Sequence, residues 1–375
     1  MRYVIAHAYS STNSGDGLLV EEAIRLIEEV DERAEVIVLA LDPDSFTDRA
    51  NVRFVHPFTG EARSASNTTV LRAALISVLR GLRLPQKTSR LLDEADLIVG
   101  VGGGYMRGAN AVEALKMVLA HLPQLATANR SATPAVYLPQ SVGALRWGTQ
   151  ALVRTHGANI VWHVRDDRSL SLLEGSATVR RTPDTAVLPL GSMTVHPRIA
   201  AETEDSATFG LVARSLHSTR TRMARYVDAI RRTVASLHAR PLLQASARGN
   251  NDDRFYSETL GRAAESSLIQ ATSSTADDRP HVIVSVRLHG AIQSIRNGVP
   301  AIHLSYERKG WGAYEDLGIA EYVHNAFDFD PDLVRRQALA LSTDSSGYWN
   351  AVAERAAHIN GARETLLADL RVARG

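Results

Sequence analysis

Short apolar runs alternate with stretches of helical periodicity through the first half of the chain, and this alternation constrains the fold more than any other feature. Runs that are apolar on both faces and separated by helices are typical of a parallel sheet covered on both sides. We therefore expect a doubly wound, Rossmann-like α/β domain over residues 1–190. Its apolar runs lie at 3–8, 35–41, 52–57, 95–102, 135–140 and 160–165, with helices expected near 17–30, 68–83 and 111–121.

A second series of the same kind predicts a second α/β domain over residues 208–330. It has apolar runs at 208–214, 241–246, 281–287 and 300–306, with helices expected near 219–238, 254–265 and 290–297. Residues 191–207 are rich in proline, small and polar residues and predict a linker. The pattern of residues 331–375 predicts a helical tail. Because ligands bind beyond the carboxyl ends of such strands, we expect the two domains to face a cleft.

Composition limits the chemistry that this chain can perform. A net charge of +1 gives no overall field that would mark a nucleic-acid-binding protein. The absence of cysteine excludes disulfides, thiol nucleophiles and cysteine-ligated metals. The histidines show no ligand spacing, so no metal is expected. No apolar stretch reaches the roughly 18 residues that span a bilayer, and the first run is too short for a signal peptide, so we expect a cytoplasmic enzyme.

A strand of β-branched residues, "HVIVSVR", ends in Arg287 and is followed at once by His289 and Gly290. A helix that begins near Gly290 offers backbone N–H groups and the positive end of its dipole, and both attract an anion. Arg287 adds donors suited to phosphate or carboxylate, and His289 can exchange a proton with the ligand. In the alternative interpretation, Arg287 pairs with a carboxylate and His289 caps the helix.

The stretch "SSTNSGDGLLVEEAI" follows the first strand, at the equivalent position of the first domain. Residues Asn13 to Asp16 predict a turn-rich loop that leads into a helix near Gly17. Asp16 is expected to be the N-cap of that helix. The alternative is that Asp16 faces the crevice as a base, since a substrate hydroxyl would arrive there.

A glycine cluster and a further arginine also follow strands. The cluster "GVGGGYMRG", with Gly103 and Gly104, matches neither the Walker spacing nor a complete dinucleotide fingerprint. We expect it to allow a close backbone approach to a ligand or to the neighbouring domain. Arg214 ends the first strand of the second domain, where it can join Arg287 around one small dianion.

Four other residues are candidates from their positions. Arg165 stands before two acids and suits either an acceptor site or a structural ion pair. Asp184 is expected to stabilise a turn. Lys309 and Trp311 lie in an expected loop beyond the last strand, where a tryptophan can stack on a sugar or cover the edge of a core.

The expected helix near 70–83 has two interpretations. Leu71, Leu75, Val78 and Leu82 form one stripe, with arginines elsewhere, and this pattern predicts an ordinary helix packed on its domain. The alternative is peripheral contact with a membrane that carries a lipid-linked acceptor. That contact would place the protein at the inner face of the membrane.

The order of these motifs resembles that of the polysaccharide pyruvyl transferase family. The resemblance rests on "NSGDG", "ADLIVGVGGG", "YLPQSVG", "VRDDRSLSLL", "TPDTAVL", "VAR" and above all "SVRLHGAIQSIRNGVPAIHLSY", and it runs to about residue 323. It implies a two-domain fold like that of the GT-B glycosyltransferases. It also implies an enzyme that attaches pyruvate from phosphoenolpyruvate, as a ketal, to two hydroxyls of a saccharide or lipid-linked saccharide and releases phosphate.

The resemblance implies that Arg287 and His289 of the "RLH" motif are donor-site residues, and Arg214 is carried over with them. We expect His289 to be the general acid, Arg287 and Arg214 to hold phosphate and carboxylate, and Asp16 to be a base for the acceptor. The expected donor site comprises Arg214, Arg287, Leu288, His289, Gly290 and Lys309. The expected acceptor site comprises Asn13, Asp16, Gly103, Gly104, Arg165 and Trp311. Phosphoenolpyruvate is a co-substrate, and no cofactor is expected.

Two other functions remain open at the level of the sequence. One is a nucleotide-sugar-dependent glycosyltransferase or epimerase of the same architecture, whose donor phosphates would also bind at a helix N-terminus in the second domain. The other is a non-catalytic saccharide-binding protein. The acceptor sugar, the hydroxyls that are ketalised and the oligomeric state are not indicated by the sequence.

Overall fold

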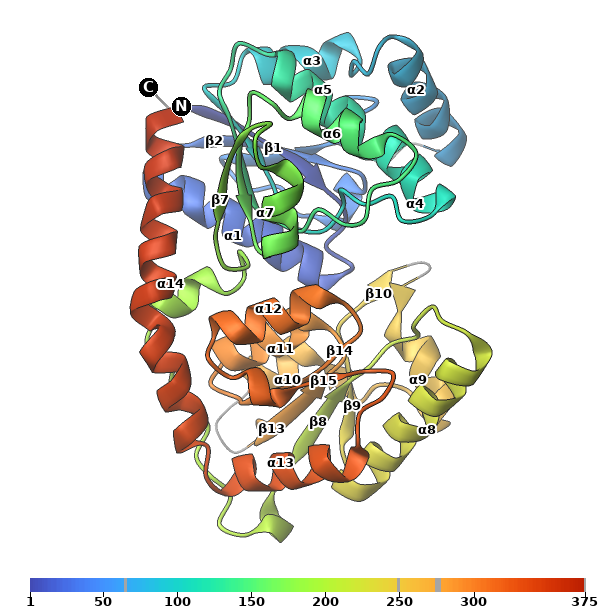
Figure 1. Cartoon of the computed structure of the whole chain (residues 1–375), viewed down its shortest axis with the longest axis vertical. Coiled ribbons are helices and arrows are strands. Elements are labelled where there is room, and N and C mark those ends of the chain that lie inside the picture. The colour runs from blue at the N-terminus through green and yellow to red at the C-terminus, as the bar shows by residue number, and fades with distance from the viewer. Residues whose placement is uncertain (64–65, 248–249, 274–277, 374–375) are drawn as a thin grey trace. The chain divides into compact units, whose positions relative to one another are not determined.

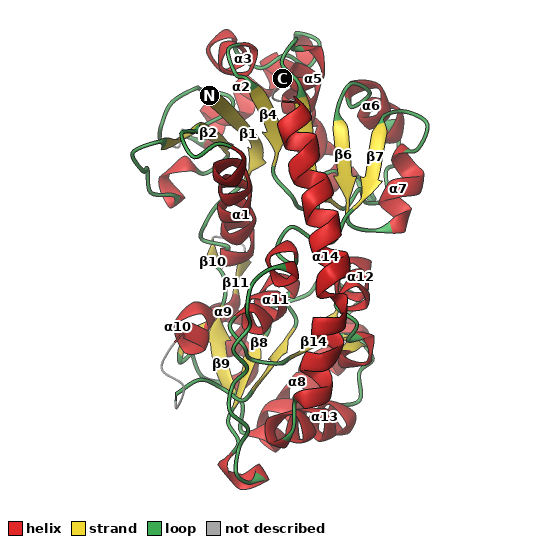
Figure 2. Ribbon diagram, turned by 90° about the vertical axis from the view of Figure 1, so that its left-hand side faces the viewer, coloured by secondary structure: helices red, strands yellow, loops and turns green. Residues whose placement is uncertain are grey.

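The computed structural model describes residues 1–63, 66–247, 250–273 and 278–373, and the chain forms two compact units. Unit 1 contains Met1–Ser11, Asp16–Thr185 and Gly361–Gly375, and unit 2 contains Thr12–Gly15 and Ala186–Asn360. Each unit is built on a parallel sheet with helices packed around it (Figure 1, Figure 2). Phosphoryl and sugar ligands of such sheets bind at the carboxyl ends of the strands, so these edges position the candidate sites.

Unit 1 has a seven-stranded sheet in the order β3-β2-β1-β4-β5-β6-β7. Its strands are β1 Arg2–Ala8, β2 Glu35–Ala40, β3 Val52–Val55, β4 Leu97–Gly100, β5 Ala135–Gln140, β6 Val161–Val164 and β7 Thr178–Arg181. Its α-helices are α1 Ser14–Val30, which begins within unit 2, α2 Asn67–Leu79, α3 Gln86–Asp93, α4 Ala111–Lys116, α5 Leu122–Arg130, α6 Thr149–His156 and α7 Asp167–Leu173. A 3₁₀ turn, η1, spans Pro43–Ser45, and a π-helical segment, η2 Met117–His121, joins α4 to α5.

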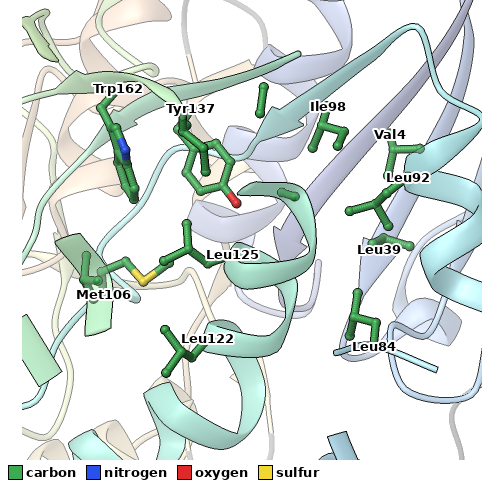
Figure 3. Close-up of a cluster of buried hydrophobic side chains, with 14 of the residues drawn as sticks. Val4, Leu39, Leu84, Leu92, Ile98, Met106, Leu122, Leu125, Tyr137 and Trp162 are labelled. Atoms are coloured by element: carbon green, nitrogen blue, oxygen red, sulfur yellow. The ribbon is translucent and has the colours of Figure 1, made fainter. Parts of the chain in front are cut away.

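The core of unit 1 lies where the central strands meet the helices on one face of the sheet. Val4, Ile98 and Tyr137 from three neighbouring strands pack with Leu125 of α5 and with Trp162 (Figure 3). All five side chains are completely buried. The indole N–H of Trp162 donates to the carbonyl oxygen of residue 157 at 2.9 Å, so its one polar group is satisfied inside the core.

Unit 2 has a six-stranded sheet in the order β12-β9-β8-β13-β14-β15, and two short strands, β10 and β11, pair antiparallel with each other. The strands are β8 Phe209–Val212, β9 Arg240–Leu243, β10 Ser246–Ala247, β11 Asn250–Asn251, β12 Ser266–Ser267, β13 Val282–Ser285, β14 Ala301–Ser305 and β15 Val323–Asn325. The helices are α8 Arg220–Leu237, α9 Asp252–Leu260, α10 Leu268–Ser273, α11 Leu288–Arg296, α12 Arg308–Asp316, α13 Pro331–Thr343 and α14 Ser346–Ala373. Three 3₁₀ turns are η3 Leu188–Gly191, η4 Glu204–Ser206 and η5 Ala320–Tyr322.

Both sheets wind outward in two directions from a central pair of strands. In unit 1 the first strand pairs with the second on one side and with the fourth on the other, and in unit 2 β8 pairs in the same way with β9 and β13. Every pairing within these two sheets is parallel. The predicted fold class of two doubly wound α/β sheets is therefore confirmed. The crossover connections run in opposite directions from the two central strands of each sheet, which are β1 and β4 in unit 1 and β8 and β13 in unit 2. This divergence leaves room for a ligand at the carboxyl edge between the two strands.

The last helix, α14, contributes to both units. Its residues up to Asn360 group with unit 2, and its residues from Gly361 group with unit 1. In unit 1, His163 and Arg180 both contact the carboxylate of Asp369, at 3.0 and 2.6 Å. The sequence predicts residues 331–375 as a separate tail after a domain at 208–330, whereas in the structure these residues form α13 and α14 and are shared between the units.

Candidate active site

Two arginines leave the sheet of unit 2 at the same level. In the parallel ladder between β8 and β13, Val212 lies opposite Ser285. Arg214 and Arg287 each follow two residues later, so both emerge at the carboxyl edge beside the central strand pair. This is the position at which a doubly wound sheet binds its ligand.

Arg287 forms a buried ion pair with Asp252, the first residue of α9. The guanidinium donates through Nε to both carboxylate oxygens, at 2.9 and 3.1 Å, and a second nitrogen also contacts the carboxylate. Asp252 accepts a further hydrogen bond from the backbone N–H of Ala245 at 3.0 Å. Arg287 is 6% and Asp252 1% exposed in their side chains. Burial raises the pKa of Asp252, and Arg287 opposes that shift.

This ion pair bears on the predicted role of Arg287. The alternative interpretation from the sequence, in which Arg287 pairs with a carboxylate, describes this contact. The pair fixes the guanidinium rigidly at the strand end but brings a negative charge close to it. Arg214 also lowers the pKa of Asp252, so the two arginines and the carboxylate act on one another electrostatically.

The helix α11 begins at Leu288, two residues before the expected start. Its N-cap is Arg287, which makes no side-chain capping bond. His289 is therefore in the first turn and is not the cap. A Cβ atom at Gly290 would lie 2.4 Å from Oε1 of Gln244 and 3.0 Å from Oγ of Ser285. The first turn of α11 thus packs tightly on the residue that follows β9.

Residues 12–15, of which Ser14 and Gly15 begin α1, belong to unit 2 and pack on the first turn of α11. Asn13 forms a β-bridge with Ala245, and the backbone N–H of Ser14 donates to the carbonyl oxygen of Gln244 at 3.3 Å. A Cβ atom on Gly15 would lie only 2.7 Å from Nδ1 of His289. The "NSGDG" and "RLHG" motifs, about 270 residues apart, therefore meet in one place.

The other predicted donor residues lie around the same edge. Arg214 is half-buried, and its guanidinium contacts Tyr306, with 3.4 Å to the hydroxyl and 5.8 Å to the ring centre. Lys309 pairs with Glu307 at 3.0 Å. The prediction that Lys309 lies in a loop is wrong, because α12 begins at Arg308. The ends of β8, β13 and β14 thus bring two arginines, a histidine and a lysine together.

A buried histidine, His303 of β14, lies beneath this edge. Its Nδ1 contacts the carbonyl oxygen of Ser285 at 2.8 Å, and a Cβ atom on Gly310 would lie 2.3 Å from its Nε2. Burial, with smaller contributions from Lys309 and His289, lowers the pKa of His303 to about 4, although the hydrogen bond with Ser285 opposes the shift. His303 is therefore neutral at physiological pH, and its Nδ1–H donates to the strand.

The predicted acceptor residues of unit 1 lie at the carboxyl edge of its own sheet. Arg165 is 3% and Asp184 1% exposed, and the two form a buried ion pair. Of the two interpretations of Arg165, the structure shows the ion pair, and its partner is Asp184. Gly103 has φ +155°, and a Cβ atom on Gly104 would lie 3.5 Å from the guanidinium of Arg165. The acceptor roles of these three residues stay predictions.

Two predicted acceptor residues are in helices. Asp16 lies in the first turn of α1, which begins at Ser14, so Asp16 is not the expected N-cap. Trp311 is 37% exposed and lies in α12, not in a loop. Their contact with an acceptor also stays a prediction. Within the described residues, no group of three histidine or acidic side chains is placed to hold a metal ion.

A polar aromatic cluster at the carboxyl edge of unit 1 was not predicted from the sequence. His7 has φ +72° and is buried, with Nε2 2.8 Å from the hydroxyl of Tyr137. Its ring stacks on Tyr105, which stacks in turn on His121. Burial lowers the pKa of His7 well below its usual value and that of His121 to about 4. Positive φ at a non-glycine residue and a π-helical segment ending at His121 are typical of functional edges, and neither is visible in the sequence.

Comparison with known proteins gives a family and a fold. The model of the polysaccharide pyruvyl transferase family matches residues 13–308. No curated protein matches the chain. Several solved structures share its architecture throughout. A protein of Listeria monocytogenes described as a UDP-N-acetylglucosamine 2-epimerase has a TM-score of 0.56 at 13% identity, covering 99% of this chain and 95% of that one.

Two further structures give the same result. The UDP-GlcNAc 2-epimerase of Neisseria meningitidis bound to UDP-GlcNAc has a TM-score of 0.55 at 10% identity, covering 99% of each chain. MnaA of S. aureus with UDP has a TM-score of 0.52 at 12% identity, covering 99% of this chain and 95% of that one. At such identities the likeness shows the fold alone, which is GT-B-like.

Proposed function

Because the chain belongs to the polysaccharide pyruvyl transferase family, we propose that it transfers pyruvate from phosphoenolpyruvate, as a ketal, to two hydroxyls of a saccharide. One observation carries the proposal. Arg214, Arg287 and His289 follow the two central strands of unit 2, where the register places the two arginines at the same level. A small anion is the ligand that such an edge would bind.

The proposed reaction begins with proton transfer from His289 to the methylene carbon of phosphoenolpyruvate. The neighbouring carbon becomes cationic, and a sugar hydroxyl adds to it and loses its proton. The C–O bond to phosphate then breaks, and the second hydroxyl forms the other ketal bond. Of the two hydroxyl protons, one replaces the proton that His289 gave and the other leaves with phosphate. Asp16 is the proposed base for the acceptor.

The geometry suggests different roles for the two arginines. Arg287 is held by Asp252 and is rigid, so it is suited to orienting one anionic group against the first turn of α11. Arg214 is half-buried against Tyr306 and supplies the positive charge at the mouth of the site. Together with the helix N-terminus, they would hold phosphate and carboxylate while charge redistributes.

Close packing around His289 supports its role as the acid. Gly15 leaves no room for a Cβ atom beside Nδ1, so the first turn of α1 restricts the ring. A restricted ring presents its proton in one direction, which general acid catalysis requires. Glycine at this position is therefore part of the proposed site.

The reaction itself is tested by incubating the protein with phosphoenolpyruvate and a panel of simple glycosides. We expect phosphate release that depends on the glycoside, and a product heavier by one pyruvate less one water. The alternative functions give other results: a nucleotide-sugar enzyme would bind UDP-sugars and ignore phosphoenolpyruvate, and a non-catalytic protein would bind a glycoside without releasing phosphate.

The role of His289 is tested by H289Q. We expect turnover to fall at least about 100-fold, with phosphoenolpyruvate binding retained within severalfold, because the acid is lost and the arginines remain. The matched control is H217Q, which changes an exposed histidine three residues beyond Arg214 and should leave turnover unchanged. Full activity of H289Q would remove His289 from the mechanism.

A further inference from the structure

Helix α2 of unit 1 carries its large apolar side chains on the outside. They are Leu71, Leu75, Ile76 and Leu79, with exposed fractions of 50, 47, 41 and 83%. The residues that α2 buries are Ala74 and Ser77. The usual arrangement of a helix packed on its domain is the reverse, with large apolar residues inward. Leu71 and Leu75, which the expected packing would place inward, are therefore exposed, whereas α2 packs on the core of unit 1 through Ala74, with Val70 and Ala73 beside it.

Contacts with the rest of unit 1 fix the orientation of α2. Ala74 of α2 packs in the core of the unit. Just beyond the last turn, Arg130 of α5 donates to the carbonyl oxygens of Gly81 and Leu82, at 2.7 and 3.1 Å. Ser66 caps the first turn by accepting from the backbone N–H of Thr69 at 3.3 Å, which stabilises the helix itself. The outward face is therefore a feature of the folded unit.

Other exposed apolar residues lie on neighbouring segments. Val112 and Leu115 of α4 are 63% and 58% exposed, and Trp147 is 64% exposed. Helix α2 packs against η2, into which α4 runs directly (Figure 1). A Cβ atom on Gly108 would lie 3.5 Å from Ala114 of α4 and 3.2 Å from Thr149, so the loop with Trp147 adjoins α4. We call these seven side chains, four of them on α2, the apolar face.

The charge over residues 62–92, which include α2, has one sign, whereas Glu113 of α4 lies between Val112 and Leu115 and pairs with Arg107 at 3.2 Å. Residues 62–92 contain six cations, Arg63, Arg72, Arg80, Arg83, Lys87 and Arg90, and not one Asp or Glu. Over the whole chain, cations and anions almost balance, at 42 and 41. Lys87 pairs with Glu61 at 2.7 Å. Arg72, Arg80 and Arg83 make no ion pair with any other residue that the structure describes.

We propose that the apolar face of unit 1 docks on an anionic lipid bilayer. A helix with exposed leucines and flanking arginines lies in the plane of a membrane interface, with leucines among the acyl chains and arginines at the headgroups. In the described part of the chain, no helix has the length and apolarity to cross a membrane, so the contact is peripheral. Aromatic side chains such as Trp147 favour the same interface.

The charge argues against a second copy of the chain as the occupant. In a symmetric dimer the same patch meets itself, so the arginines of one α2 would face those of the other. Like charges across an interface disfavour association, whereas an anionic surface is complementary to them. The inference does not depend on the reaction, because it rests on residues outside the proposed active site.

The test is flotation of the whole protein with vesicles of phosphatidylcholine, alone or in equal parts with phosphatidylglycerol. We expect binding to the mixed vesicles, weakened by salt, and no binding to the neutral ones. The triple variant R72Q/R80Q/R83Q should bind about 100-fold more weakly, at roughly fivefold for each cation. L75Q/L79Q should lose at least about tenfold, because two side chains no longer enter the bilayer.

The matched control is I269Q, which replaces a side chain that is 48% exposed in α10 of unit 2 and should bind like the wild type. Circular dichroism should show all variants folded, since the changed residues are exposed. An inability of the wild type to float with mixed vesicles would overturn the proposal. So would a dimer in sedimentation velocity that L75Q/L79Q dissociates, because a second copy would then cover the face. Release of phosphate with a water-soluble glycoside should persist in every variant, which separates this test from that of the enzyme.

Discussion

Among single residues, the ion pair between Arg287 and Asp252 determines where the guanidinium lies in the proposed donor site. The guanidinium is taken out of water at a strand end, and only a carboxylate with two ordered oxygens compensates for that burial. The cost of burying both charges is justified if a rigid arginine orients an anion, because a mobile one would lose conformational entropy on each binding event.

This interpretation predicts the behaviour of D252N. Removing the carboxylate charge leaves a buried guanidinium without its counter-ion, so the free energy of unfolding should fall by about 3–5 kcal/mol in urea titrations. The matched control is E258Q on the same helix, where the pair with Arg254 is exposed and its loss should leave the unfolding midpoint nearly unchanged. If D252N unfolded at the wild-type urea concentration, the pair would contribute nothing to stability.

The sequence identifies Arg287 and His289 as candidate site residues, because a charged residue at the end of a buried strand is unusual. Asp252 could not be predicted, since it lies 35 residues away in a stretch with several acids. Only the crossover from β9 to α9 shows which carboxylate reaches the strand end. His7 was hidden for a similar reason, because its strained backbone leaves no mark in the residue pattern.

At the scale of elements, the contact between the start of α1 and the start of α11 joins the first motif of the chain to the main one. Gly15 and Gly17 are both buried glycines of α1, but they face different neighbours. A Cβ atom on Gly15 would meet Nδ1 of His289 at 2.7 Å, whereas one on Gly17 would meet Ser11 at 3.4 Å. The two positions therefore offer a matched pair of substitutions.

G15A should displace the imidazole of His289 and lower turnover by roughly ten- to 100-fold, as expected when a catalytic group is misplaced. Its unfolding free energy should fall by about 1–3 kcal/mol through overpacking. G17A should keep both quantities near the wild-type values, because 3.4 Å is an ordinary contact. Steady-state kinetics and urea unfolding of the two variants measure the difference. Equal turnover of G15A and wild type would show that the ring is not restricted by this glycine.

Elements with long buried runs were predictable and elements at edges were not. The central strands read as β-branched runs because both of their faces are covered. The edge strand β7, Thr178–Arg181, has alternating exposed residues and two arginines, so it carries no comparable signal. Helix α2 misleads in another way. The sequence periodicity identifies the apolar stripe with Leu71 and Leu75, but it does not distinguish a stripe that faces a protein core from one that faces a lipid bilayer.

At the scale of the whole molecule, histidines held neutral by burial occur in both units. Burial lowers the pKa of His56, His121 and His303 to about 4 and that of His7 well below its usual value. Their ordinary pKa is near 6.5. Below pH 6.5 these histidines therefore bind protons in the unfolded chain but not in the folded units. The free energy of unfolding should fall as the pH is lowered from about 6.5 toward 4.

The variant H303N tests one share of this loss. The amide nitrogen of asparagine can replace Nδ1–H as donor to the carbonyl of Ser285, but it does not titrate. At pH 5 a group whose pKa is lowered from 6.5 to 4 costs about 2 kcal/mol of stability. We expect the urea midpoint of H303N to fall less than that of the wild type between pH 7.5 and 5. Parallel curves for the two proteins would show that His303 accepts a proton while folded.

The division of α14 between the units has a consequence for how the protein forms during translation. Unit 2 is fully synthesised once Asn360 has been added. Unit 1 then still lacks its last segment, which includes the buried side chains of Leu366, Leu367 and Leu370 and the carboxylate of Asp369. The segment that completes unit 2 therefore leaves the ribosome before the segment that completes unit 1. Most of unit 1 is synthesised earlier, but the apolar surface against which these leucines pack stays exposed until the last turns of α14 have left the exit tunnel.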